Sequence, residues 1–238
     1  MMTTIARNYT TWRICVWCGW IFLAGYLASW GVLGFNVPTL EPSIPQADLY
    51  THYVTHSARI RLAFGLSVFF MPFYFVMSAV ISRVMQRIEG PDGPFAICEQ
   101  MGGALTVVTG QVAGIAWLVG AFRVDERGPA IVRTLYDFGW LYFDMTFMIT
   151  TLQMFAMAYV FLSDKRAVPL FPSWVSWLSI FVGLSFVLLL LLPFLTTGPF
   201  AWNGLFNYWV TLGGFFAWCL VILVYLSKVI NRLEREEP

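Results

Sequence analysis

The sequence predicts an all-α membrane protein, a polytopic helix bundle with six transmembrane helices and with the N and C termini in the cytoplasm. Two observations predict this class. The 238 residues are 59% hydrophobic and only 11% charged, whereas a soluble domain is usually about 25% charged. Apolar runs of about 20 residues, the length that crosses a bilayer as a helix, recur along nearly the whole chain. We therefore expect a single transmembrane domain over residues 1–238 and no separate soluble domain.

Three helices are predicted in the first half of the chain, at about residues 12–33, 58–84 and 95–122. The first apolar run is longer than a signal-peptide core and is followed by no A-x-A cleavage pattern, so we expect it to be retained. The loop at 34–57 is the longest, and its three prolines keep its first half extended. Its second half can form a helix that leads into the second span.

Two features shape the second and third predicted helices. Pro72 lies in the middle of the second helix, where it removes a backbone hydrogen bond, and it is expected to kink the helix. In the third helix, Gly110 and Gly114 form a small-x-x-x-small pattern. Such a pattern lets a second helix backbone approach closely.

Three further helices are predicted in the second half, at about residues 136–162, 171–194 and 205–226. The run 136–162 contains no Lys, Arg or Pro, although it carries two acidic residues. The sequence Thr-Thr-Gly-Pro at 196–199 ends the fifth helix. After the sixth helix we expect a charged tail at 228–238.

An even number of spans places both termini on one side, and the positive charges indicate which side. Nine of the fourteen Lys and Arg residues fall on the terminal side and five on the other. The positive-inside rule then favours cytoplasmic termini in a multi-pass protein of the inner (plasma) membrane. The net charge of +1 gives no reason to expect a nucleic-acid partner. The lipid bilayer is the expected partner, with a homo-oligomer or other membrane subunits as further alternatives.

The four cysteines all fall within apolar stretches, at Cys15, Cys18, Cys98 and Cys219. The pair Cys15-x-x-Cys18 lies inside the first predicted helix. A free cysteine in such a place behaves as a small apolar residue. We therefore expect packing rather than a disulfide framework or redox chemistry.

Acidic and amide side chains inside the spans define the first candidate site. Asp144 lies about 10 Å beyond Asp137 along one helix, at a depth where an unpaired charge costs several kcal/mol. The third and fourth predicted helices are antiparallel across a short loop, so Gln111 is expected near Asp144. Together with Gln153 and Glu99, these residues form a predicted polar track, as in proton or substrate paths. The alternative is a protonated Asp144 that hydrogen-bonds Gln111 and so joins two helices.

The only two histidines define a second candidate site. Asp48, His52 and His56 follow one another at intervals of four residues, which places them on one helical face. Two imidazoles and a carboxylate can bind zinc, copper or non-haem iron. The alternative is an amphipathic helix whose polar face meets water. Arg59 and Arg61, one turn further on, would repel a cation.

Several signatures of known chemistry are missing from the sequence. It contains no G-x-x-x-x-G-K-[ST], no G-x-S-x-G and no G-x-G-x-x-G at a strand-to-helix turn. No histidine lies inside a predicted span, which excludes a bis-histidine haem within the bilayer. Clusters of aromatic residues at 69–75, 140–143 and 215–218 can line a pocket for an apolar ligand or serve in ordinary packing.

Three short segments resemble bacterial six-helix integral membrane proteins of unassigned function. They are Pro172-Ser173-Trp174-Val175-Ser176-Trp177, Leu162-Ser163-Asp164-Lys165-Arg166 and Thr197-Gly198-Pro199-Phe200-Ala201-Trp202-Asn203-Gly204. The six-span layout with its long first outer loop is also similar. The resemblance implies the architecture and no particular activity.

Three functions from different classes follow from these features. The first is a membrane protein that binds an apolar or lipid-like molecule, or that serves as a subunit of a membrane complex. The second is a small proton-coupled secondary transporter that uses Asp144. The third is a metal-dependent membrane enzyme with Asp48, His52 and His56 as ligands, and it alone calls for a cofactor, a metal ion.

Overall fold

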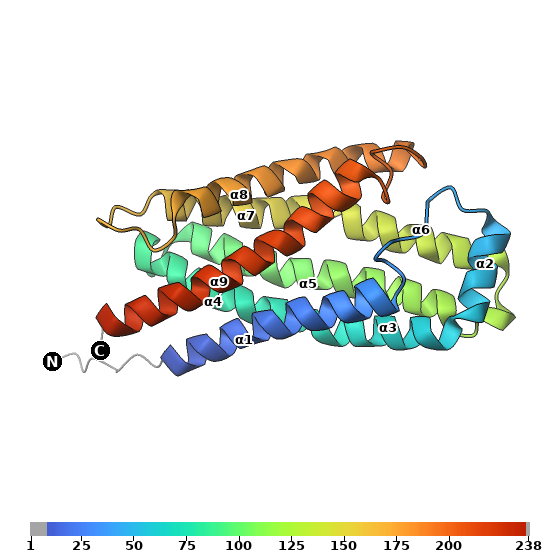
Figure 1. Ribbon diagram of the computed structural model, residues 1–238, viewed down its shortest axis with the longest axis horizontal. Helices are drawn as coiled ribbons and strands as arrows, with labels where there is room; N and C mark the ends of the chain where they lie inside the picture. Colours follow the sequence, from blue (N-terminus) through green and yellow to red (C-terminus); the bar gives the residue numbers. More distant parts are fainter. Residues whose placement is uncertain (1–8, 237–238) are drawn as a thin grey trace.

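The protein is an all-helical bundle, as its composition predicts. The computed structural model describes residues 9–236, and within that range the chain forms helices, turns and loops without a strand. The helices run along the long axis of the molecule (Figure 1). Six helical stretches are long and apolar enough to cross a membrane, namely Tyr9–Leu33, Ser57–Glu89, Pro94–Ala121, Pro129–Leu162, Ser173–Phe194 and Leu205–Glu236.

Most of these spans are built from two helical segments rather than one. The first three spans are α1 (Tyr9–Tyr26) with η1 (Leu27–Leu33), α3 (Ser57–Phe70) with α4 (Pro72–Glu89), and α5 (Pro94–Ala121). The last three are α6 (Pro129–Met145) with α7 (Phe147–Leu162), α8 (Ser173–Ser185) with η3 (Phe186–Phe194), and η4 (Leu205–Leu212) with α9 (Gly213–Glu236). Two short helices lie between spans, α2 (Gln46–Thr55) and η2 (Val124–Glu126).

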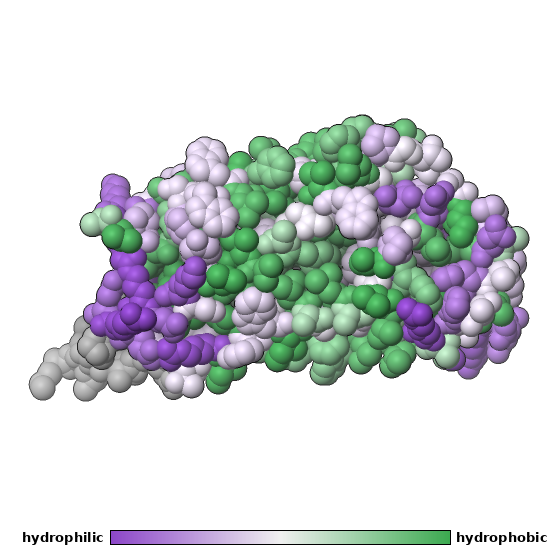
Figure 2. Space-filling model, viewed as in Figure 1, coloured by the Kyte–Doolittle hydropathy of each residue, from purple (hydrophilic) through white to green (hydrophobic). Residues whose placement is uncertain are grey.

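The surface has the pattern of a membrane protein. On the face shown in Figure 2, apolar residues cover the middle of the molecule and hydrophilic residues gather at its two ends. The start of α1 and the end of α9 lie at the same end (Figure 1), where Arg13 Nη1 donates to Glu234 Oε1 at 2.9 Å. This arrangement is the one that an even number of crossings requires.

The opposite end is closed by the loop that precedes α2. Trp202 Nε1 donates to the carbonyl oxygen of Leu40 at 3.0 Å, and Tyr208 donates to that of Asn36. Arg133 donates to the carbonyl oxygens of Pro42, at 3.3 Å, and of Ile44. Because these donors come from α6 and from the segment before α9, the loop joins the two halves of the chain.

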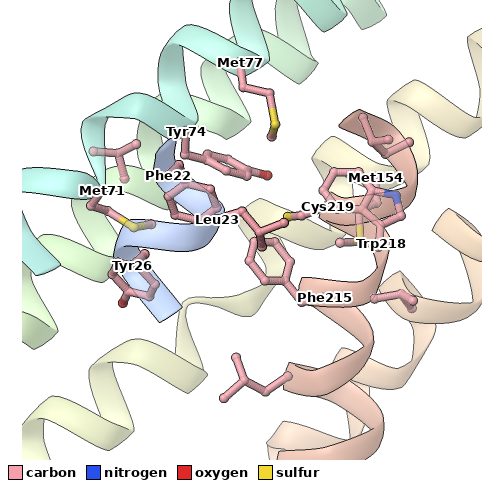
Figure 3. Packing of buried hydrophobic residues seen from close by; sticks show 14 of the residues in the cluster. Phe22, Leu23, Tyr26, Met71, Tyr74, Met77, Met154, Phe215, Trp218 and Cys219 are labelled. Carbon is pink, nitrogen blue, oxygen red and sulfur yellow. The ribbon is translucent and has the colours of Figure 1, made fainter. Parts of the chain in front are cut away.

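Small residues bring the helices of the bundle close together. A Cβ atom on Gly114 would lie 3.2 Å from Val68 Cγ2, and one on Gly110 would lie 2.7 Å from Met71 Cε. The predicted small-x-x-x-small pattern therefore marks the face of α5 that packs on the second span. Larger side chains fill the space between α1, α4 and α9, where the ring of Tyr74 lies beside Phe22 (Figure 3).

Three predicted helix ends are wrong, because charged residues continue the helices beyond the apolar spans. The second span continues to Glu89 rather than ending near residue 84. The fourth span begins at Pro129 rather than near residue 136; a proline at the first helical turn suits its fixed φ angle. The last helix continues to Glu236 rather than ending near residue 226. Its extension buries Val229, Ile230 and Leu233 against the bundle, so it is an amphipathic helix and not a loose tail.

Two other predictions from sequence are confirmed. The second span is interrupted at Pro72, since α3 ends at Phe70 and α4 begins at the proline. All four cysteines are free. Cys219 is fully buried against apolar neighbours, whereas Cys98 is exposed.

Candidate functional site

A cavity lies at the centre of the bundle and is lined by residues from all six spans. Its volume is about 40 Å³, which is room for about three water molecules at roughly 10–15 Å³ each. Most of its wall is apolar, with Phe22, Phe143 and Phe216 among the rings. Its polar lining comprises Tyr26, Thr106, Thr109, Asp144, Thr146, Thr150, Asn207 and Thr211.

The helices change their hydrogen-bonding pattern at the level of this cavity. In five of the six spans the change occurs at or beside a residue that lines it; these residues are Tyr26, Met71, Thr146, Phe186 and Leu212. The helix α5 passes the cavity without a break. Changes of this kind within a helix are frequent at functional or strained sites. Inside a membrane they are tolerated where the backbone is buried in protein or lines a water-filled space.

Asp144 is the only acidic residue in the cavity lining. It belongs to the last turn of α6, near the middle of the span Pro129–Leu162, and its residue is 7% exposed. It has no hydrogen-bond or ion-pair partner among the residues that the structure describes. No Lys, Arg or His from the described range lines the cavity either. A carboxyl group without a partner in a mainly apolar site is costly, which makes Asp144 a candidate for a functional position.

Two more polar groups at the cavity lack partners. The hydroxyl of Tyr26, on α1, and the side-chain oxygen of Asn207, on η4, are buried and accept or donate no hydrogen bond within the described chain. The amide nitrogen of Asn207 is used, because it donates to the carbonyl oxygen of Phe200. Buried polar groups are nearly always hydrogen-bonded in native proteins. Three unpartnered groups around one cavity therefore indicate a place that receives a polar group from outside the chain.

The threonines of the lining, by contrast, are paired with one another. Thr106 and Thr150 are joined through their hydroxyl oxygens at 2.9 Å, and Thr146 donates to Thr109 at 3.0 Å. These two contacts join α5 to the α6–α7 span at residues that follow Asp144 in the chain. Thr146 also bonds the carbonyl oxygen of Tyr142, at 3.0 Å. A hydroxyl bonded to the preceding turn often bends a helix, and Thr146 lies where α6 ends and α7 begins.

A second buried polar cluster lies nearer the end that carries the termini. Glu99 is fully buried, and its Oε1 atom accepts hydrogen bonds from Ser78 Oγ at 2.8 Å and from Gln153 Nε2 at 3.0 Å. Tyr74 in turn donates to Gln153 Oε1 at 3.1 Å. The Oε2 atom of Glu99 has no partner in the described chain. The ring of Tyr74 lies beside the rings of Phe22 and Phe215, which line the cavity. The cluster is therefore adjacent to the cavity wall.

The structure separates the predicted polar track into parts. The expected contact between Asp144 and Gln111 is wrong, since Gln111 Nε2 donates to the carbonyl oxygen of Val68 at 3.3 Å and faces the second span. Asp137 lies at the outer part of α6, half-exposed, with Arg133 Nη1 at 3.7 Å. Only Glu99 and Gln153 of the predicted set are in direct contact.

The second candidate site lies outside the spans, around α2. The rings of His52 and His56 are 4.8 Å apart and share contact with the ring of Phe35. The guanidinium of Arg59 lies 3.9 Å from the centre of that same ring. Asp48 is exposed at the start of α2. Within residues 9–236 no three His, Cys, Asp or Glu side chains meet as metal ligands, so a metal at Asp48, His52 and His56 stays a prediction.

His52 should make the stability of the protein depend on pH. Burial, with smaller contributions from His56 and Arg59, lowers the pKa of His52 from 6.5 to about 4. The folded protein therefore resists a proton that the unfolded chain already binds below pH 6.5, and stability is lost as the pH falls from 6.5 towards 4. We expect the melting temperature to fall less steeply over this range in His52→Gln, which cannot titrate. Equal slopes in the two proteins would contradict this account.

Sequence reasoning missed four polar members of the central site, Tyr26, Thr106, Asn207 and Thr211. Asn207 carried a signal, because it is an amide inside a predicted apolar helix. Tyr26 carried none, since a tyrosine in a span is usually a packing residue or an interface anchor. Which side chains meet at the cavity depends on the rotation of each helix, and composition does not specify that rotation.

Compared with known protein families, with curated proteins and with solved structures, the chain matches none of them. The resemblance noted for three short segments therefore concerns the six-span architecture and implies no activity. What supports a function is the chemistry of the cavity.

Proposed function

We propose that this six-span protein binds a small ligand in its central cavity and that the carboxyl group of Asp144 anchors the polar end of that ligand. One observation carries the proposal: Asp144 lines the cavity and has no partner within the described chain. The mainly aromatic wall suits a ligand whose remaining part is apolar. This is the ligand-binding form of the first function expected from sequence, in a plasma-membrane protein with cytoplasmic termini.

The stability of Asp144→Leu tests whether Asp144 serves binding or structure. Leucine has the same branched side-chain shape, and it removes a carboxyl group that has no hydrogen-bond partner within the described chain. We expect the variant to be more stable than the wild type by about 1 kcal/mol, as is common when a functional polar group is removed. Thermal unfolding of the purified protein in detergent measures this. A clear loss of stability would show that Asp144 holds the helices together.

The bound molecule itself can be sought in the same preparations. Organic extraction of wild-type protein followed by mass spectrometry should yield a small compound that is absent from Asp144→Leu. Asp137→Asn is the matched control, because Asp137 lies on the same helix, outside the cavity, and should retain the compound. Identical extracts from wild type and Asp144→Leu would count against ligand binding at this carboxyl.

Proton-coupled transport through Asp144 is a second candidate, and the interrupted helices favour it. Transporters often bind substrate and ions near the middle of the membrane, between helices whose backbone is broken there. Here five spans change their helical pattern at the cavity. In proteoliposomes, a pH gradient should drive uptake of one of a panel of small organic solutes by the wild type. Uptake should be lost in Asp144→Asn and kept in Asp137→Asn; uptake that survives in Asp144→Asn would exclude this role.

A further inference from the structure

We propose that the polar end of the ligand is a primary ammonium group, bound by Asp144, Asn207 and Tyr26 together. This inference deepens the proposed function and rests on it. It names the chemical class of the ligand as a small primary amine in its cationic form. The evidence is the set of acceptor atoms that the cavity leaves free, its charge, its wall and its size.

The free acceptors match the donors of an ammonium group. The Asp144 carboxyl, the Asn207 side-chain oxygen and the Tyr26 phenolic oxygen all belong to residues that line the cavity, and each lacks a partner within the described chain. They come from three different spans, α6, η4 and α1. A primary ammonium has three N–H donors and no acceptor. It can therefore offer one N–H to each of the three oxygens, which an alcohol with a single O–H cannot do.

The charge of the cavity calls for a cation. Asp144 is the one acidic residue of the lining, and no Lys, Arg or His of the described chain accompanies it. An ionised carboxylate in such a site needs a positive partner. An ammonium ion supplies that charge together with its hydrogen bonds. A charge-assisted hydrogen bond is roughly twice as strong as a neutral one.

The aromatic wall and the volume favour an organic cation of small size. Phe22, Phe143 and Phe216 line the same cavity, and the face of an aromatic ring attracts a cation, most strongly where water is excluded. The 40 Å³ of space holds about three water-sized groups. Ethylammonium, with three non-hydrogen atoms, is therefore the natural probe.

The test is the binding of radiolabelled ethylammonium to the purified protein in lipid nanodiscs, measured by scintillation proximity. Unlabelled ethylammonium should compete. Ethanol lacks the charge, and tetramethylammonium lacks the N–H donors, so neither should compete at the same concentration. Asp144→Asn should weaken binding about tenfold or more, and Tyr26→Phe about threefold. Tyr159→Phe, a substitution on the exposed side of α7, should leave binding unchanged.

Three results would overturn the inference. Competition by ethanol would indicate a neutral hydroxyl ligand, and competition by Na⁺ would indicate an oxygen-bound metal cation. Ethylammonium binding that is absent, or unaffected by Asp144→Asn, would remove the ammonium site. If Asp144→Leu then still gains stability and loses its co-purified compound, ligand binding stands and only the ammonium class is wrong. If Asp144→Leu is destabilised, the ligand site itself is lost as well.

Discussion

Trp140→Ala should destabilise the protein by about 3–5 kcal/mol, the usual cost of replacing a fully buried large aromatic residue by alanine. Trp140 has no exposed surface and packs among three other tryptophans. Its ring centre lies 5.3 Å from that of Trp117, 6.2 Å from that of Trp30 and 5.8 Å from that of Trp202, on which it stacks within 12°. These rings come from three spans and from the loop before η4, so the substitution opens a hole where four parts of the chain meet.

The loss should extend to the loop that closes the outer end. Trp202 holds that loop through its hydrogen bond to Leu40, and Trp140 is the surface against which Trp202 stacks. Unfolding in detergent, followed by circular dichroism, measures the stability of the variant. Trp177→Ala is the matched control, because Trp177 is 61% exposed on the outside of α8; we expect a change within about 0.5 kcal/mol. Similar losses in both variants would mean that the tryptophan cluster is not a centre of packing.

The number and order of the spans could be predicted because transfer of a helix into a membrane depends on composition summed over about 20 residues. The ends of the helices could not be predicted in the same way. Hydropathy marks only the apolar part of a helix, whereas α9 continues beyond its apolar part as an amphipathic helix with Val229, Ile230 and Leu233 buried. A charged residue ends an apolar run without ending a helix, as the Arg232–Glu236 pair one turn apart shows.

The candidate site was predictable in part. Asp144 stands out in the sequence because it is an acid deep within an apolar run, and this is a local property. Its expected contact with Gln111 is wrong, because the depth of a residue in the membrane does not determine the direction in which its side chain points. Gln111 points to Val68 on a different span, a matter of helix rotation. The break at Thr146 could not be predicted, because no glycine or proline stands at that position. What accompanies the break is the pair of hydrogen bonds made by the Thr146 hydroxyl.

Glu99→Ala should destabilise the protein by about 3 kcal/mol or more, because it removes the acceptor of two buried donors at once. Ser78 and Gln153 both donate to Glu99 Oε1, and neither residue is exposed by more than 1%. Gln153 Nε2 is then left without its acceptor, which costs about 1–3 kcal/mol. Ser78 Oγ keeps only its contact with the backbone carbonyl oxygen of residue 99, at 3.3 Å, and the shortened side chain leaves a cavity that adds to the loss. The helices have little freedom to rearrange, since a Cβ atom on Gly103 would lie only 2.4 Å from Ser78 Cβ. The side chain of Ser78 already packs directly against the backbone of α5 at Gly103.

Glu99→Gln separates the role of the acceptor from the role of the charge. Glutamine keeps one side-chain oxygen for Ser78 and Gln153, and its amide nitrogen takes the place of Oε2, which accepts no hydrogen bond in the described chain. A neutral side chain at this position thus serves the same two donors, and we expect a loss of only about 1 kcal/mol. Thermal unfolding of the two variants beside the wild type gives both values. If glutamine proved as damaging as alanine, the negative charge of Glu99 would be what its neighbours require, and the cluster would be an ionised site rather than a hydrogen-bonded contact between α4, α5 and α7.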